Sequence, residues 1–227
     1  MTPIEKAIRT ALAAHRKQKL DEDGQPHIIH CMEVMLAVKK ETETYPFPKV
    51  LETYTLEELM IAAVLHDSVE DSKGLVTLDR IEKRYGKNVR DIVDSVTRRG
   101  VDTPNKEFYR DFIYRAKANI GGKFVKNADV VHNFGRSHKI KQASWRNKLQ
   151  YKYLIALEVL NGSLTWEEAS WSVEHEKGDH FFVADPNGKK IEITGEEFQI
   201  LKGSWAKAKS EEANRLTAPS FPERIAE

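Results

Sequence analysis

The sequence predicts an all-α protein, with a helical bundle over residues 1–162 and a small C-terminal extension over residues 163–227. Two observations predict the bundle: helix-start signals recur through the first 160 residues, and Gly- or Pro-containing turns separate the segments between them. A third observation predicts the extension, because its last part changes to two short apolar segments around a turn, which is typical of a β-hairpin.

The first signal is at the N-terminus, where Thr2 is followed by a proline and by Glu5. An N-cap threonine, a proline at the first helical position and a glutamate three residues after the cap predict a helix over about 3–19. The turn sequence at 21–26 ends this helix. A second helix is expected over about 30–40.

Thr55 and Glu58 form a second capping box, which opens an apolar helix. Thr77 and Asn88 are suitable N-caps for two more helices, with Gly86 between them as a stop. Further helices are expected at about 106–119, 123–134 and 144–160.

The extension is expected to begin with a short helix capped by Thr165. The segments 180–184 and 190–194 flank the turn sequence Asp-Pro-Asn-Gly at 185–188, which predicts a β-hairpin. One more helix over about 196–213 and a loose C-terminal end complete the prediction.

Composition excludes several classes of protein. Of the 227 residues, 40% are hydrophobic and 31% are charged, a balance typical of a globular protein. The longest apolar run, 59–65, is far shorter than the roughly 20 residues of a membrane span. Glu5 and Lys6 interrupt any signal peptide, so we expect a cytoplasmic protein. The single cysteine, Cys31, excludes an internal disulfide or a cysteine-based zinc site.

Charge is distributed unevenly along the chain, although the formal net charge is only +1. That small total predicts neither nucleic-acid nor membrane binding. The segment 112–157, however, contains ten basic residues and a single acid, Asp129. Such a segment suits a site for a phosphorylated anion. The alternative is a solvated helix face that the acidic C-terminal part neutralises.

The strongest chemical signal is the run Leu-His-Asp-Ser-Val-Glu-Asp at 65–71, at the end of the apolar helix. Ionisable groups at the end of a buried helix are costly unless something compensates them. In helical geometry His66 shares a face with Glu70, and Asp67 shares one with Asp71. A divalent cation would satisfy these imidazole and carboxylate groups. The alternative is a surface cap with salt-bridged acids and no metal.

Two more segments carry candidate ligands. His30 lies at the start of the second predicted helix, and Asp129 lies one helical turn before Asn133. Each alone has an ordinary interpretation, as a partly buried histidine or a solvated acid. Asp129 is less easily explained in that way, because it is the only acid in its basic segment.

The order His…His-Asp…Asp resembles the HD phosphohydrolase superfamily, and in particular the hydrolase domain of the RelA/SpoT homologues. The stretches that carry the resemblance are His15-x-x-Gln18, Gly24-x-Pro26-x-Ile28-x-His30, the run 65–71, Tyr85-Gly86-x-x-Val89, Val93-x-x-Val96-Thr97-Arg98, Glu107-x-Tyr109 and Lys126-x-Ala128-Asp129-x-x-His132-Asn133. They occur in family order over roughly residues 1–160. The remaining residues are too few for the family's synthetase domain, so the resemblance implies a standalone alarmone hydrolase.

The resemblance implies a role for each site residue. One manganese ion would be held by His30, His66, Asp67 and Asp129. Glu70 and Asp71 would orient and deprotonate the attacking water, and Asn133 would contact the nucleotide. Among the basic residues, Lys19, Lys126 and Arg136 are the candidate contacts for this small-molecule substrate.

The implied activity is removal of the 3′-pyrophosphate of a guanosine or adenosine alarmone. Leu20 and Asp21 stand where the family has an Arg-Lys pair, and His27 stands where it has a tyrosine. The alternatives are another HD phosphohydrolase, such as a nucleotidase or an NADPH-type phosphatase, and a non-catalytic nucleotide-binding module. The sequence leaves the oligomeric state open.

Overall fold

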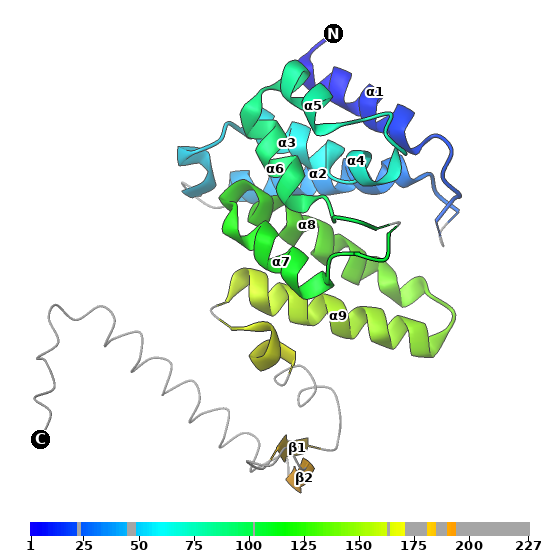
Figure 1. The fold of residues 1–227 in the computed structure, drawn as a ribbon, viewed down its shortest axis with the longest axis vertical. Coiled ribbons are helices and arrows are strands. Elements are labelled where there is room, and N and C mark those ends of the chain that lie inside the picture. The colour runs from blue at the N-terminus through cyan, green and yellow to red at the C-terminus, as the bar shows by residue number, and fades with distance from the viewer. Residues whose placement is uncertain are drawn as a thin grey trace, which may run out of the picture. The chain divides into compact units, whose positions relative to one another are not determined.

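The computed structural model describes residues 1–21, 24–44, 49–101, 103–162, 164–170, 181–184 and 190–193. The chain divides into two compact units, Met1–Ser170 and Trp171–Glu227. The described part of the first unit is helical (Figure 1), which confirms the predicted fold class. Its elements are α1 (Pro3–His15), α2 (His27–Thr44), η1 (Lys49–Glu52), α3 (Leu56–Leu65), α4 (Ser68–Asp71), α5 (Leu78–Tyr85), α6 (Lys87–Val96), α7 (Tyr109–Ala118), α8 (Ile120–Arg136), η2 (Ser137–Lys139) and α9 (Ala143–Asn161).

Helix α3 forms the centre of the bundle. It packs against α1, α2, α6 and α8, and its residues from Ile61 to Leu65 are all buried. The capping box of Thr55 and Glu58 is present at its start, as predicted. Because α3 is buried from Ile61 to its last residue, the polar residues that follow it lie in the interior of the protein, between α2 and α8.

Helix α8 approaches α6 closely at its N-terminal end, where the sequence has two glycines. A Cβ atom at Gly122 would lie 1.9 Å from Oγ of Ser95, and one at Gly121 would lie 2.7 Å from the side chain of Ile92. Glycine is therefore required for this contact. Helix α9 packs along the other side of α8 (Figure 1).

Several helix boundaries differ from the predicted ones. Helix α1 ends at His15 rather than near residue 19, and α2 begins at His27 rather than near residue 30. The expected cap Asn88 is also wrong, because α6 begins after Gly86 and the Asn88 amide instead donates to Oε1 of Glu58 at 2.9 Å. The earlier start of α2 places His27 and His30 one turn apart on one helix, which matters for the site.

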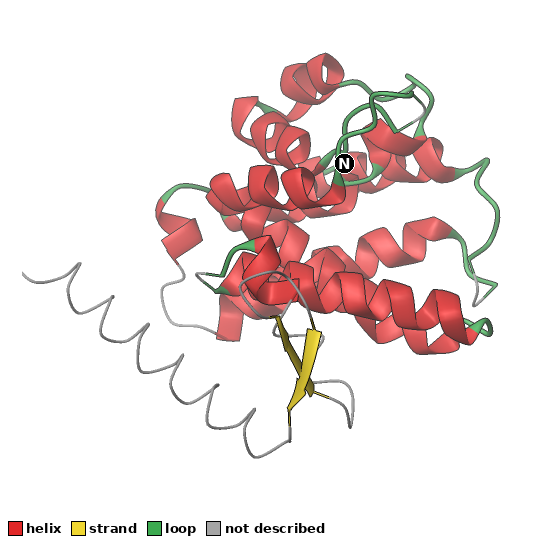
Figure 2. Cartoon of the chain, turned by 60° about the horizontal axis from the view of Figure 1, so that its bottom comes forward, coloured by secondary structure: helices red, strands yellow, loops and turns green. Residues whose placement is uncertain are grey.

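In the second unit, β1 (Phe181–Ala184) pairs with β2 (Lys190–Ile193) in antiparallel register, with Phe181 opposite Ile193 (Figure 2). The hairpin expected from the sequence is thus present. The turn at 185–188 and the helix expected at 196–213 lie outside the described residues. The domain boundary expected after residue 162 stays a prediction. Within the described ranges no helix combines the length and the apolar character that crossing a bilayer requires.

Candidate metal centre and active site

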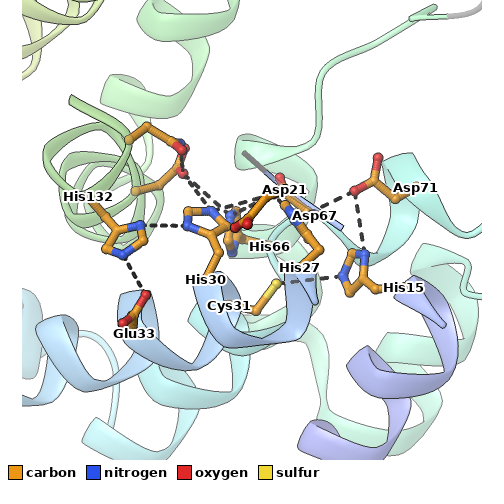
Figure 3. A network of polar contacts seen from close by, with 12 residues as sticks. His15, Asp21, His27, His30, Cys31, Glu33, His66, Asp67, Asp71 and His132 are labelled. Carbon is orange, nitrogen blue, oxygen red and sulfur yellow. Dashed lines mark hydrogen bonds and ion pairs between the residues drawn. The ribbon is translucent and has the colours of Figure 1, made fainter. Parts of the chain in front are cut away.

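Four side chains from three parts of the bundle meet beside the end of α3. His30 comes from α2, His66 and Asp67 directly follow α3, and Asp129 comes from α8. Nε2 of His30 lies 3.2 Å from Oδ1 of Asp129 and 3.8 Å from Oδ2 of Asp67. Nε2 of His66 lies 3.0 Å from Oδ2 of Asp67 and 3.6 Å from Oδ1 of Asp129. The structure therefore brings together the four residues that the sequence singles out as ligands, three of which, His30, His66 and Asp67, are labelled in Figure 3.

The ring of His66 is oriented by the helix that precedes it. Its Nδ1–H donates to the carbonyl oxygen of Ala63 at 2.8 Å. This bond turns Nε2 toward the carboxylates of Asp67 and Asp129, and Nε2 is buried there without a hydrogen bond among the described residues. A buried nitrogen without a partner is costly. A cation between the carboxylates would satisfy it.

The ring of His30 is oriented from the opposite side, by a chain of two further residues. Nδ1 of His30 lies 2.7 Å from Nδ1 of His132, and Nε2 of His132 lies 2.7 Å from Oε2 of Glu33 (Figure 3). If His132 donates from Nε2 to the carboxylate, its Nδ1 accepts from Nδ1–H of His30. Nε2 of His30 is then unprotonated and faces Asp129. Outer partners of this kind fix the tautomer of a metal-ligating histidine.

The donor set and its spacing suit a first-row divalent ion. Two imidazole nitrogens and two carboxylate oxygens are ordinary ligands for such ions. Ligands about 2.0–2.2 Å from an ion lie roughly 3–3.5 Å apart when they are neighbours in its coordination shell. The four distances between 3.0 and 3.8 Å fall close to that range.

The carboxylates of the cluster are ionised in spite of their burial. Burial by itself raises the pKa of Asp129, but Lys126 and the two histidines hold it well below its usual range. Burial likewise opposes ionisation of Asp67, whose pKa is nevertheless held well below normal by His66 and a hydrogen bond from His27. The cluster therefore has the negative charge that a cation needs.

Glu70 and Asp71 have a different character from the ligand carboxylates. Burial, followed by the charge of Asp67, raises the pKa of both carboxyl groups. Oε2 of Glu70 accepts a hydrogen bond from the backbone N–H of Arg98 at 3.0 Å, which leaves Oε1 for another partner. A held carboxylate with a raised pKa is suited to accept a proton.

The two residues also face different neighbours. Glu70 lines a cavity of about 170 Å³ beside the cluster. Asp71 lies instead against α1 and the start of α2, where its Oδ2 is 3.5 Å from Nδ1 of His15 and 3.8 Å from Nε2 of His27.

The cavity beside Glu70 has cations and aromatic rings in its wall. Its lining includes Arg98, Tyr109, Lys126, Lys152 and Tyr153. Nζ of Lys152 lies 4.5 Å from the ring centre of Tyr109 and 4.6 Å from that of Tyr153. Burial, together with the charges of Lys126 and Arg98, lowers the pKa of Lys152 to about 8. These groups can hold phosphate oxygens next to the carboxylate cluster.

A second cavity of about 160 Å³ adjoins the first, with which it shares Asn133 and Tyr153. Its wall includes Arg136, which forms an ion pair with Asp21 at 2.8 Å, and the ring of Trp145. Each of the two neighbouring cavities thus combines charged groups with aromatic rings, and the first also contains the cluster carboxylates. Such a pair suits a molecule with phosphate and base parts.

The predicted substrate contacts lie in different places. Asn133 donates to Oδ1 of Asp129 at 2.5 Å. Lys126 is buried and donates to Oδ2 of Asp129 at 2.7 Å. Arg136 lines the second cavity, whereas Lys19 is exposed and is not among the described residues that line either cavity.

Sequence reasoning missed His132 and Glu33 as partners of His30. Lys152 is one of the ten basic residues of the segment 112–157, but the sequence does not single it out as a cavity residue. His132, Arg98 and Tyr109 lie within the family-like stretches, which is a signal that could have found them. Lys152 and Tyr153 reach the site only through the packing of α9 on α8. No spacing in the sequence indicates that contact.

The fold and the cluster define a class, the helical HD-domain hydrolases with a bound metal. Comparisons with known proteins narrow this class. The HD domain family matches residues 7–106. The mouse and human guanosine-3′,5′-bis(diphosphate) 3′-pyrophosphohydrolases MESH1 are each 30% identical to the chain, over 65% and 67% of its length and 77% and 79% of theirs. The chain belongs to this family of HD-domain pyrophosphohydrolases.

Two further similarities are more distant. The Aquifex aeolicus protein named guanosine-3′,5′-bis(diphosphate) 3′-pyrophosphohydrolase is 27% identical over 79% of the chain, but the match spans only 23% of that longer relative. The solved structure of a metazoan SpoT orthologue, described as hydrolysing ppGpp, matches with a TM-score of 0.57. The match covers 78% of this chain and 97% of the chain in that structure, at 21% identity, and so supports the fold.

Proposed function

We propose that this protein hydrolyses the 3′-pyrophosphate of a ppGpp-like alarmone, releasing pyrophosphate and the 5′-nucleotide. The observation that carries the proposal is the position of Glu70, whose carboxylate lines the same cavity as Asp67, Asp129, Arg98 and Lys152. A water-activating carboxylate, cation ligands and phosphate-binding cations thus surround one small space. The names of the mouse and human relatives support this choice of substrate.

The resident cation is proposed to be Mn²⁺, held by His30, His66, Asp67 and Asp129. When bound, such an ion lowers the pKa of water and offsets phosphate charge. Without a cation, the four carboxylates of Asp67, Glu70, Asp71 and Asp129 would repel a pyrophosphate group.

The chain's own residues supply the rest of the mechanism. Glu70, fixed at Oε2 by the backbone of Arg98, takes the proton of the attacking water at Oε1. Arg98 and Lys152 hold the oxygens of the pyrophosphate and offset the charge that develops on them. Asn133, which lines both cavities, is placed where the nucleotide passes from one to the other.

The nucleoside is proposed to occupy the second cavity, with its base beside Trp145 or Tyr153. The substrate is thus a free nucleotide rather than a nucleic acid, and we propose a cytoplasmic location.

Product analysis tests the proposal. The protein is freed of metal with a chelator, reloaded with Mn²⁺ and incubated separately with ppGpp, ppApp and NADPH. Pyrophosphate release from an alarmone is the expected result. Orthophosphate release, from NADPH or another nucleotide, would favour the second function, a different HD phosphohydrolase. Binding of nucleotide without any turnover would favour a non-catalytic module.

A further inference from the structure

His27 extends the cluster beyond the four ligands described above. It is the first residue of α2, one turn before His30, and its side chain is 22% exposed. Its Nε2 lies 3.0 Å from Oδ2 of Asp67 and 3.8 Å from Oδ2 of Asp71. The mechanism proposed above assigns no part to His27, and it uses Asp71 only as a source of negative charge.

Oδ2 of Asp67 is shared by the imidazole nitrogens of three histidines (Figure 3). Nε2 of His66 is 3.0 Å away and Nε2 of His30 is 3.8 Å away. Nε2 of His27 is also 3.0 Å away. A carboxylate that several nitrogen donors share can bridge the ions of a two-metal site, which are about 3.5–4 Å apart.

Nε2 of His27 is hydrogen-bonded to Asp67 in the metal-free protein, at a spacing that a coordination shell could also use. Neighbouring ligands of one ion lie roughly 3–3.5 Å apart when each is about 2.0–2.2 Å from it. The 3.0 Å and 3.8 Å distances from His27 to the two carboxylates are close to this range and match those on the His66 side, which are 3.0 Å and 3.6 Å.

Residues of α1 and the turn after it support the second group of donors from outside. The ring of His15 lies 4.7 Å from that of His27, and its Nδ1 lies 3.0 Å from Oε1 of Gln18. Gln18 also makes a side-chain hydrogen bond to Asp71. His27 and Asp71 are therefore held toward each other by partners that are not themselves needed as ligands.

Charge favours two cations over one. The carboxylates of Asp67, Glu70, Asp71 and Asp129 gather around the end of α3, and Lys126 is the buried ammonium that pairs with Asp129. One dication and one ammonium offset three of these four negative charges. A second dication would reverse the sign of the cluster and so favour the approach of a multiply charged phosphate.

We propose that the protein binds two divalent cations, the second held by His27 and Asp71 and joined to the first through a bridging Asp67. The side chains of His27, Asp67 and Asp71 are 22%, 25% and 27% exposed, respectively. Water and substrate can therefore reach this second position. The inference rests on the proposed function only in taking the His30–His66 side as the first cation site.

Counting bound Mn²⁺ tests the proposal independently of turnover. Metal-free protein is titrated with Mn²⁺ and the bound ion is measured by calorimetry and by low-temperature electron paramagnetic resonance. The wild type is expected to bind two ions per chain and to give the signal of a spin-coupled pair. The His27→Phe variant, which keeps an aromatic ring but removes the nitrogen donor, should bind one ion without coupling.

Two companion variants keep the test decisive. Asp71→Asn should also reduce the count to one, and it answers the question if His27→Phe does not fold. His138→Phe is the matched control, because His138 is exposed and its ring bonds to the carbonyl of Gly135 at the end of α8. This control should bind two ions.

Saturation of the wild type at one ion would overturn the second site, as would two coupled ions in both His27→Phe and Asp71→Asn. Alarmone hydrolysis by a one-ion wild type would leave the proposed function standing without this inference. A wild type that binds two ions but does not hydrolyse alarmones would support this inference and contradict the proposed function.

Discussion

Lys126 and Asp129 form a buried ion pair within α8, with Nζ of the lysine 2.7 Å from Oδ2 of the carboxylate. Both side chains are almost completely buried, at 9% and 5% exposed. The ammonium group is the charge that keeps Asp129 ionised before a cation arrives. The same ion pair therefore stabilises the metal-free protein and keeps Asp129 in the charged form that binds a cation.

Replacement of Lys126 by methionine should destabilise the metal-free protein by about 3–5 kcal/mol, the usual cost of leaving a buried charge without its partner. Addition of Mn²⁺ should recover much of this loss, because the ion then offsets the charge of Asp129. Denaturant unfolding with and without Mn²⁺ measures both values. Lys123→Met, on the same helix but partly exposed, is the control. Equal losses in the two conditions would show that Lys126 does not act through Asp129.

Loss of a ligand should remove activity and the stability that the metal provides. His66→Ala and Asp129→Ala are each expected to abolish hydrolysis and to remove the rise in melting temperature that Mn²⁺ produces, because an ion that binds only the folded state stabilises it by mass action. Thermal melts across a Mn²⁺ series measure this effect. A variant that keeps wild-type activity in chelator-treated buffer would contradict the ligand assignment.

Glu70→Gln separates proton transfer from metal binding. Glutamine keeps the size of the side chain and can still accept the hydrogen bond from the backbone of Arg98, but it cannot take a proton from water. We expect turnover to fall roughly 10²-fold or more while the affinities for Mn²⁺ and nucleotide are retained. Loss of the metal together with the activity would identify Glu70 as a ligand instead.

The fall of kcat/KM at alkaline pH should report the deprotonation of Lys152. Burial lowers the pKa of this lysine to about 8, so the positive charge is present below that pH and is lost as the pH rises through it. The kcat/KM for an anionic substrate is therefore expected to fall above about pH 8, since this ratio reports the free enzyme. Lys152→Arg, whose guanidinium stays charged, should move the fall to higher pH. An unchanged alkaline limb in that variant would assign it to another group.

Base selectivity should be low. Leu20, which replaces an arginine of the family pattern, is 61% exposed, and neighbouring Asp21 is paired with Arg136 in the wall of the second cavity. A guanidinium stacked on a purine contributes roughly 0.5–2 kcal/mol, most of which a leucine cannot replace. We expect kcat/KM for ppGpp and ppApp to agree within about tenfold.

The competing interpretation is that Lys19 takes the arginine's place. Comparison of the two substrates in the wild type and in Lys19→Ala distinguishes these cases. A strong wild-type preference that disappears in Lys19→Ala would establish the lysine as the base contact.

Local signals predicted the helix starts well where a side chain caps the helix. Thr2 with Glu5 and Thr55 with Glu58 make the expected reciprocal bonds. The prediction failed at α2, which begins at His27 directly after a proline and whose start shows no such signal. It failed again at Asn88, where contact with Glu58 on another helix takes the amide away from the local backbone.

The site residues also fall into those that a local pattern predicts and those that only tertiary packing brings together. The spacing of His66, Asp67, Glu70 and Asp71 is local, so the sequence alone indicates it. His30 and Asp129 are candidates from their own segments, and the family resemblance joins them to His66 and Asp67 as ligands of one ion. The hydrogen bond between His30 and His132 joins residues 102 positions apart. Lys152 reaches Tyr109 only because α9 packs on α7 and α8. Contacts of this kind depend on tertiary packing, which no short pattern encodes.

Gly122, Lys126, Asp129 and Asn133 recur at intervals of four, three and four residues, and so lie along one stripe of α8. The stripe begins where a hydrogen atom is all that fits against Ser95. Two turns later, roughly 10 Å along the axis, it presents the carboxylate that faces both histidines. A rigid helix transmits a displacement at one end to the other. A side chain at position 122 would push α8 away from Ser95 and so displace Asp129 from His30 and His66. Gly122 therefore determines the position of Asp129, although it takes no part in the chemistry.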